Sequence, residues 1–183
     1  MTNFEIYTYI QSRKGGGNTD TDNLDALINR SITEINNDRV TTVGRRAFSA
    51  CESLTTVNLP SVTNIAKDAF VSCTSLTAIN LPLVTKIEYA SFNGCTHLTT
   101  ADFPLLTRIE PAAFLGCTML TTLVLRRNTV ATLDHTNAFT STPIASGAGF
   151  IYVPDELVES YKTATNWVTY ANQIKGISGL EET

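Results

Sequence analysis

A single phrase recurs along the middle of this chain at a fixed spacing, and this repeat constrains the fold more than any other feature. The segments AFSACESLTTVNLP, AFVSCTSLTAINLP, SFNGCTHLTTADFP and AFLGCTMLTTLVLR each begin 22 residues after the one before. Sequence repeats of roughly 20 to 50 residues are typical of solenoids, in which each repeat is one structural unit stacked on the next. The sequence therefore predicts a stack of similar coils.

Several columns of this repeat are apolar in every copy. The aromatic and thiol columns are Phe48, Phe70, Phe92 and Phe114, and Cys51, Cys73, Cys95 and Cys117. The aliphatic columns include Leu54, Leu76, Leu98 and Leu120; Val57, Ile79, Ala101 and Leu123; and Val43, Ile65, Ile87 and Ile109. A further column is Leu59, Leu81, Phe103 and Leu125. We expect these side chains to form one continuous core, with the phenylalanines and cysteines as ladders through it.

Each unit reads I-x-x-x-A-F-x-x-C-x-x-L-x-x-I-x-L-P-x-V-T-x. The L-x-x-I-x-L part predicts a strand whose alternate residues point inward, and the proline after it ends the strand because it has no N–H to donate. The A-F-x-x-C part predicts a tight 3₁₀-like turn, and V-T-x-I predicts a second short strand. In one unit alone, the apolar side chains stay exposed to water on the two sides where other coils would stack. The apolar burial is then too small to offset the backbone entropy lost on folding. The copies therefore occur in series.

This pattern resembles the BspA-like leucine-rich repeats, also called the Treponema pallidum type, whose hallmark is A-F-x-x-C-x-x-L-x-x-I-x-L-P. The resemblance covers about Leu24 to Ile177. It implies an α/β-type repeat solenoid with 22-residue coils, a parallel strand face, short 3₁₀ turns and helical caps at both ends. It also implies adhesion or protein binding at a bacterial surface.

The repeat divides the chain into five segments. They are an N-terminal arm with a glycine linker over 1–17, a degenerate capping coil over 18–42, four repeats over 43–130, a C-terminal cap over 131–177 and a tail over 178–183. Thr2 and Glu5 form a capping box for a short helix in the arm, which could pack on the solenoid or dock on another chain. The stretch TPIASGAGFIYVPDELVESYKTATNW resembles the closing cap of BspA-like proteins from gut bacteria and their phages.

The cysteine column favours free thiols in the core. Stacked coils would place the four cysteines in a row with steps of about 5 Å. One tetrahedral zinc ion needs every sulfur about 2.3 Å from a single point, so the row as a whole cannot hold one. Disulfides between neighbouring coils remain an alternative on distance alone, but a cysteine with neighbours above and below is better read as a small buried apolar residue.

No other motif predicts chemistry. His97 and His135 have no motif partner and are expected to be ordinary surface residues. The stretch DTDNLD lacks the glycine and the final glutamate of a calcium loop, so a helix N-cap explains it better. The stretches GGG and ASGAG match no phosphate-binding spacing, and there is no G-x-S-x-G. We therefore predict no catalytic residues, no metal site, no cofactor and no enzymatic activity.

Threonine forms regular columns outside the core. They are Thr55, Thr77, Thr99 and Thr121, and Thr41, Thr63, Thr85, Thr107 and Thr129. Threonine suits strand edges, and its hydroxyl can bond a neighbouring coil. A flat hydroxyl array for binding ice or glycans is the alternative.

Charge and hydropathy limit the partners and the location. A net charge of −4 does not indicate the basic surface that binds nucleic acid. The pairs Arg45–Arg46 and Arg126–Arg127 are expected to be solvated turn residues. No stretch approaches the roughly 20 apolar residues of a membrane span. Glu5, Thr8 and Gln11 interrupt the apolar part of the N-terminus, so it does not read as a secretory signal. We expect a virion-associated or cytoplasmic location over a secreted one.

The leading functional hypothesis is a non-enzymatic binding or structural module. Its expected contact surface is the outward side of the strands, which carries Thr56, Asn58, Ala78, Asn80, Thr100, Asp102, Thr122 and Val124. The partner would be a protein or a cell surface. A phage tail or capsid accessory protein is one version of this hypothesis, and a bacterial surface adhesin or a cytosolic scaffold is the other.

Overall fold

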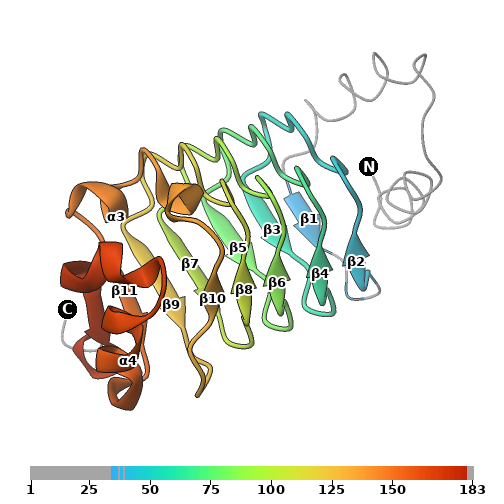
Figure 1. Cartoon of the computed structure of the whole chain (residues 1–183). Coiled ribbons are helices and arrows are strands. Elements are labelled where there is room, and N and C mark those ends of the chain that lie inside the picture. Colours follow the sequence, from blue (N-terminus) through green and yellow to red (C-terminus); the bar gives the residue numbers. More distant parts are fainter. Residues whose placement is uncertain (1–33, 37, 39, 181–183) are drawn as a thin grey trace.

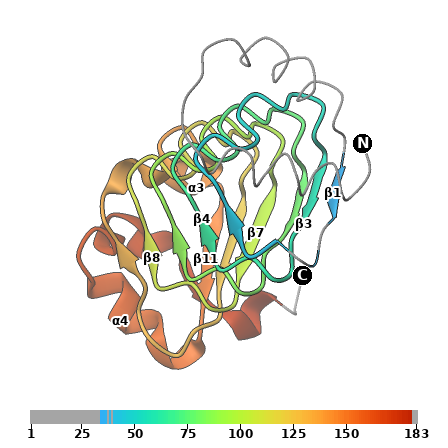
Figure 2. The same ribbon diagram turned by 90° about the vertical axis from the view of Figure 1, so that its right-hand side faces the viewer.

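The computed structural model describes residues 34–36, 38 and 40–180, which form a solenoid of stacked coils closed by short helices at its C-terminal end (Figure 1). Turned by 90°, successive coils lie one behind another (Figure 2). The arm over 1–17, the stretch DTDNLD, most of the capping coil and the end of the tail lie outside the described residues. The predicted N-terminal helices therefore stay predictions.

Two walls of short strands run the length of the solenoid. The first wall contains β1 (Glu34–Asn36), β3 (Thr56–Asn58), β5 (Ala78–Asn80), β7 (Thr100–Phe103), β9 (Thr122–Leu125), β11 (Phe150–Val153) and β12 (Ile174–Gly176). The second wall contains β2 (Thr42–Val43), β4 (Asn64–Ile65), β6 (Lys86–Ile87), β8 (Arg108–Ile109) and β10 (Thr132–Leu133). We call the solvent side of the first wall the strand face.

Neighbouring strands are parallel and pair in the register of the repeat. Val57 pairs with Ile79 on the first wall, and Ile65 pairs with Ile87 on the second. The second wall is one five-stranded sheet, whereas the first wall is divided into β1-β3-β5 and β7-β9-β11-β12. The leucine-rich-repeat solenoid with a parallel strand face is thus confirmed, but the repeat did not indicate this division.

The phenylalanine column forms a stack through the core, as predicted. Phe48 and Phe70 have ring centroids 5.3 Å apart, and the same distance separates Phe70 from Phe92. Phe114 follows at 5.6 Å and Phe139 at a further 5.8 Å, with every pair of rings within 10° of parallel. All five side chains are fully buried. The column therefore extends one coil beyond the four regular repeats.

The turns that carry the phenylalanines depend on two left-handed residues per coil. In the first coil these are Arg46 and Ala50, with φ of 54° and 57°. The N–H of Ala50 donates to the carbonyl of Val71 in the next coil at 2.8 Å, so the left-handed residue turns its donor along the stack. Such a conformation costs about 1–2 kcal/mol for a residue with a Cβ, and the bond between coils offsets part of it. Among the described coils, Gly94 and Gly116 are the residues that avoid this cost at the second position.

Short helices of the C-terminal cap cover the last coil. They are η3 (Thr136–Phe139), α3 (Pro143–Ser146), η4 (Asp155–Leu157), α4 (Val158–Thr163), η5 (Trp167–Gln173) and η6 (Ile177–Leu180). Trp167 and Tyr170 pack on the Phe139 ring at 6.2 and 5.4 Å between centroids. This packing ends the phenylalanine stack with other aromatic rings.

Side chains of the cap also complete the backbone hydrogen bonds of the second wall. The indole N–H of Trp167 donates to the Ala131 carbonyl at 2.7 Å, and the Ala131 N–H donates to the Tyr161 hydroxyl at 2.9 Å. The Asn166 amide donates to the Leu133 carbonyl at 2.7 Å. These groups supply bonds that a further coil would otherwise provide, so they protect the edge strand β10.

Candidate binding surface

The predicted contact residues do lie on the first wall, but their exposure differs. Ala78, Asn80 and Thr100 are exposed, and Thr56, Asn58, Asp102 and Thr122 are half-buried. Val124 is only 2% exposed, so its assignment to an open contact surface is wrong. Its neighbours in register are Asp102 and Tyr152.

The polar groups of the strand face are bonded to each other. The Asn80 amide donates to the Asn58 side-chain oxygen at 2.7 Å. Further along, the Arg126 guanidinium donates to both carboxylate oxygens of Asp102 at 2.7 to 3.0 Å. Both members of this ion pair are about two-fifths exposed, where such pairs contribute about 0–1 kcal/mol. The strand face is therefore polar and nearly neutral. Arg126 is exposed, as expected from the sequence, and it also forms an ion pair with Asp102.

The C-terminal end of the strand face is aromatic, which the sequence reading missed. Phe150 and Tyr152 lie edge to face with centroids 6.3 Å apart, and the Lys175 ammonium lies 3.6 Å from the Phe150 centroid. An insertion makes Phe150 pair with Thr122, 28 residues earlier, so the regular spacing could not reveal it. The echo of the repeat in FIYVP was the available signal, because it places Ile151 and Val153 in the core. Of the two aromatic residues, Phe150 is half-buried, whereas Tyr152 is only 6% exposed.

Several of the regular threonine hydroxyls are bonded between coils. Thr77 and Thr121 each donate a hydroxyl to the carbonyl of the threonine one coil earlier, at 3.1 and 3.4 Å. Thr107 does the same at 2.8 Å, and Thr96 belongs to a third such column that the sequence reading missed. Hydroxyls used in this way have their one proton engaged within the fold and can only accept from a ligand, which favours the structural interpretation.

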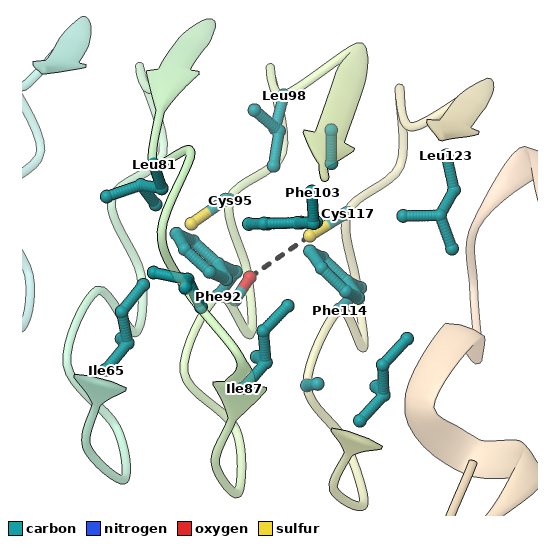
Figure 3. Close-up of a cluster of buried hydrophobic side chains, with 14 of the residues drawn as sticks. Ile65, Leu81, Ile87, Phe92, Cys95, Leu98, Phe103, Phe114, Cys117 and Leu123 are labelled. Carbon is teal, nitrogen blue, oxygen red and sulfur yellow. Dashed lines mark hydrogen bonds between the residues drawn. The ribbon is translucent and has the colours of Figure 1, made fainter. Parts of the chain in front are cut away.

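The cysteines are free and fully buried. Each of three thiols donates to the carbonyl of a phenylalanine in the preceding coil, and Cys117 to Phe92 at 3.1 Å is the example drawn in Figure 3. Burial raises the pKa of Cys95 well above its ordinary value, so this thiol is not a reactive thiolate. No group of three or more potential metal-ligating side chains gathers among the described residues.

Charged residues on the second wall connect neighbouring coils. The Lys86 ammonium lies 2.6 Å from the Glu110 carboxylate, which also accepts the Tyr89 backbone N–H at 2.9 Å. Partial burial opposes ionisation of Glu110, but these two donors outweigh it and hold its pKa below the ordinary value. Arg108 and Asp134 form a second such pair at 2.9 Å. These four charged side chains of the second wall therefore stabilise the contact between neighbouring coils.

The two histidines have structural contacts. His97 is exposed, with its Nδ1 atom 2.6 Å from the Thr74 carbonyl oxygen. His135 caps η3, because its Nδ1 accepts the Asn137 backbone N–H at 3.0 Å. The His97 Nδ1 atom also lies 3.3 Å from the hydroxyl of the adjacent Thr96, which donates to the Thr74 carbonyl. These contacts are compatible with the surface roles expected from the sequence.

A hollow of about 430 Å³ lies between β10 and the cap, lined by residues 130–134 and 164–167. Asn166 and Trp167 in its wall already bond the β10 backbone, and the Asp134 carboxylate is paired with Arg108. These three side chains of the hollow are therefore engaged in contacts within the fold. Within the described part of the chain, helices fall short of the length and apolarity that crossing a bilayer demands.

The family model described as BspA type leucine rich repeat region matches residues 25–145 with six copies. The chain belongs to the BspA-type leucine-rich repeat family. The match counts six copies, two more than the four regular units. Proteins with such repeats are generally non-enzymatic modules that mediate protein interactions.

Two solved structures resemble this BspA-type chain. A leucine rich cell surface protein from Faecalibacterium prausnitzii is 25% identical with a TM-score of 0.58, and the match covers 76% of this chain and 34% of that one. The T. pallidum leucine rich repeat protein is 27% identical with a TM-score of 0.53, and the match covers 67% of this chain and 58% of that one. The chain thus spans less than two thirds of the length of either relative. A search of curated proteins gives no significant match.

Proposed function

We propose that this chain is a protein-binding module of a bacterial surface and that the strand face makes the contact. The observation that carries the proposal is the chemistry of that face. It offers exposed small and amide side chains at Ala78, Asn80 and Thr100, next to an ion pair and the half-buried Phe150 ring at its C-terminal end. Such a surface favours hydrogen bonding and shape complementarity, since it has too little net charge to steer a partner from a distance.

The surface location rests on the relative from Faecalibacterium prausnitzii, which is described as a cell surface protein. A virion accessory role is the competing prediction from the sequence, and nothing in the fold or the comparisons favours it. A cytosolic scaffold would use the same face with a different partner. Protease treatment of intact cells of the source organism separates these locations, because only a surface protein is digested while a cytoplasmic control survives.

Photo-crosslinking tests the contact face directly. A photoreactive phenylalanine analogue placed at Asn80 or at Thr100 should form adducts with a protein partner in cells of the source organism. Thr85 is the matched control, because it is an exposed threonine beside the second wall, one coil removed from Thr100. Equal adducts from position 85, or adducts with lipid or nucleic acid only, would refute the proposal.

A further inference from the structure

The strand ladder of the first wall is interrupted between β5 and β7. At the junction before it, the Thr77 N–H donates to the Thr55 carbonyl at 3.0 Å. At the junction after it, the Thr121 N–H donates to the Thr99 carbonyl, also at 3.0 Å. Among the described residues, the equivalent bond from the Thr99 N–H to the Thr77 carbonyl is not formed.

The other end of the same strands shows the same interruption. The Leu59 N–H donates to the Asn80 carbonyl at 3.1 Å, across the junction between β3 and β5. In the part of the chain that the structure covers, the Leu81 N–H makes no corresponding bond to Asp102. Strand pairing accordingly stops at β5 and resumes at β7. The interruption thus spans the full width of the first wall.

The rest of this junction is closed. Phe70 and Phe92 stack at 5.3 Å, the same distance as the preceding pair of rings. The Ser72 N–H donates to the Asn93 carbonyl at 2.7 Å, and the second wall pairs without a gap from β4 through β6 to β8. The coils therefore separate on the strand face only, and the phenylalanine column and the second wall hold them together.

A redistribution of core volume explains the position of the gap. Ala101 occupies a column that holds valine, isoleucine or leucine in the other coils, and Phe103 occupies a leucine column. The Phe103 ring tilts between Phe92 and Phe114, at 6.5 and 6.2 Å (Figure 3). Ile79, which faces Ala101 across the junction, is only partly buried, whereas Val57 in its column is completely buried. The small Ala101 side chain offers Ile79 little surface to pack against. Packing across this junction therefore stabilises strand pairing less than at the other junctions.

We propose that this junction is a hinge, about which the two halves of the strand face tilt while the phenylalanine column and the second wall act as the axis. The N-terminal half carries the Asn58–Asn80 amide pair, and the C-terminal half carries the Asp102–Arg126 ion pair and the aromatic end. A tilt alters the spacing between these two chemically different surfaces without breaking the fold. The hinge follows from the backbone and the core, so it does not depend on the proposed partner.

Amide hydrogen exchange measured by NMR on the whole chain tests the interruption. The N–H groups of Thr99 and Leu81 should exchange at least about tenfold faster than those of Thr77, Thr121 and Leu59, which occupy equivalent positions at closed junctions. Relaxation dispersion should also report microsecond-to-millisecond exchange at residues 77–81 and 99–103. Equal protection at all five positions would overturn the interruption, and fast exchange without dispersion would overturn the hinge.

The double variant Ala101→Ile/Phe103→Leu tests the cause. It gives the third coil the same pair of core residues as Ile79 and Leu81, so the ladder should close, the two N–H groups should slow about tenfold or more, and the dispersion should vanish. Val57→Ile is the matched control, because it makes the same kind of change at a closed junction and should leave Thr99 and Leu81 unaffected. If the double variant does not fold, Ala101→Val carries the same test. A folded variant with unchanged exchange would refute the volume argument.

Discussion

Replacing Phe70 by alanine tests whether the phenylalanine column carries the stability of the solenoid. The side chain is completely buried and stacks on a ring at 5.3 Å on each side. A buried phenylalanine-to-alanine change typically costs about 3–5 kcal/mol, because apolar burial is lost and a cavity remains. We expect the upper half of this range, since neither neighbouring ring can move into the space without leaving its own partner on the far side.

Urea unfolding followed by circular dichroism and by the fluorescence of Trp167 measures this effect. With a denaturant slope near 2 kcal/mol/M, a loss of about 4 kcal/mol lowers the midpoint by about 2 M. Trp167 lies in the cap, so agreement between the two signals shows that the damage reaches the far end of the stack.

Lys67→Ala is the control for Phe70→Ala. Lys67 is exposed, and its ammonium lies 4.5 Å from the Tyr89 ring, an interaction worth about 0.5–1 kcal/mol at an exposed site. Similar losses from Phe70→Ala and Lys67→Ala would refute the argument that the column forms the core.

Three further predictions concern the cap, the thiols and pH. Trp167→Phe should cost about 1–3 kcal/mol in urea unfolding, because it leaves the Ala131 carbonyl at the end of the second wall without its indole donor. An Ellman titration of the native protein should find almost no reactive thiol and should find all four after denaturation without reductant, and two or none would indicate disulfides. Because the pKa of Glu110 is lowered in the folded state, its stabilising effect is complete above the unfolded-state pKa and is lost as the pH falls through the folded-state value. In Glu110→Gln, the free energy of unfolding should therefore fall less steeply as the pH is lowered. An unchanged pH dependence would contradict the stabilising ion pair between Glu110 and Lys86.

The core of the fold was predictable because stacking places equivalent residues in equivalent environments. The spacing of Phe48 and its equivalents predicted the buried stack, and the L-x-x-I-x-L pattern predicted the strands of the first wall. Phe139 continues the stack although it follows Phe114 by 25 residues instead of 22, so the fixed spacing alone does not predict it. The columns of a repeat thus identify the side chains that face the core.

The strand face was less predictable because its residues depend on neighbours that the repeat does not fix. Val124 has the sequence position of an exposed residue, yet it is only 2% exposed in a strand that pairs with a neighbour on each side, β7 and β11. Phe150 was missed because the inserted loop changed the spacing before it. The gap beside Ala101 was missed because alanine is as apolar as the residues it replaces, and only its volume differs.

The gap between β5 and β7 coincides with a change in surface chemistry, which offers a second explanation for it. The amide pair ends at Asn80, and the next residue in that column, Asp102, is bonded to Arg126 instead. Either the core mismatch opens the junction, or Arg126 draws Asp102 away from Asn80.

Asp102→Asn separates these two causes. It removes the charge that holds Arg126 and restores an amide that could continue the pair from Asn80. If the volume of Ala101 is responsible, the Thr99 and Leu81 N–H groups keep their fast exchange in this variant, because the core is unchanged. If the ion pair is responsible, their exchange slows toward that of Thr77. If exchange of these two N–H groups slows in Asp102→Asn but not in Ala101→Ile/Phe103→Leu, the ion pair causes the gap and the core volume does not.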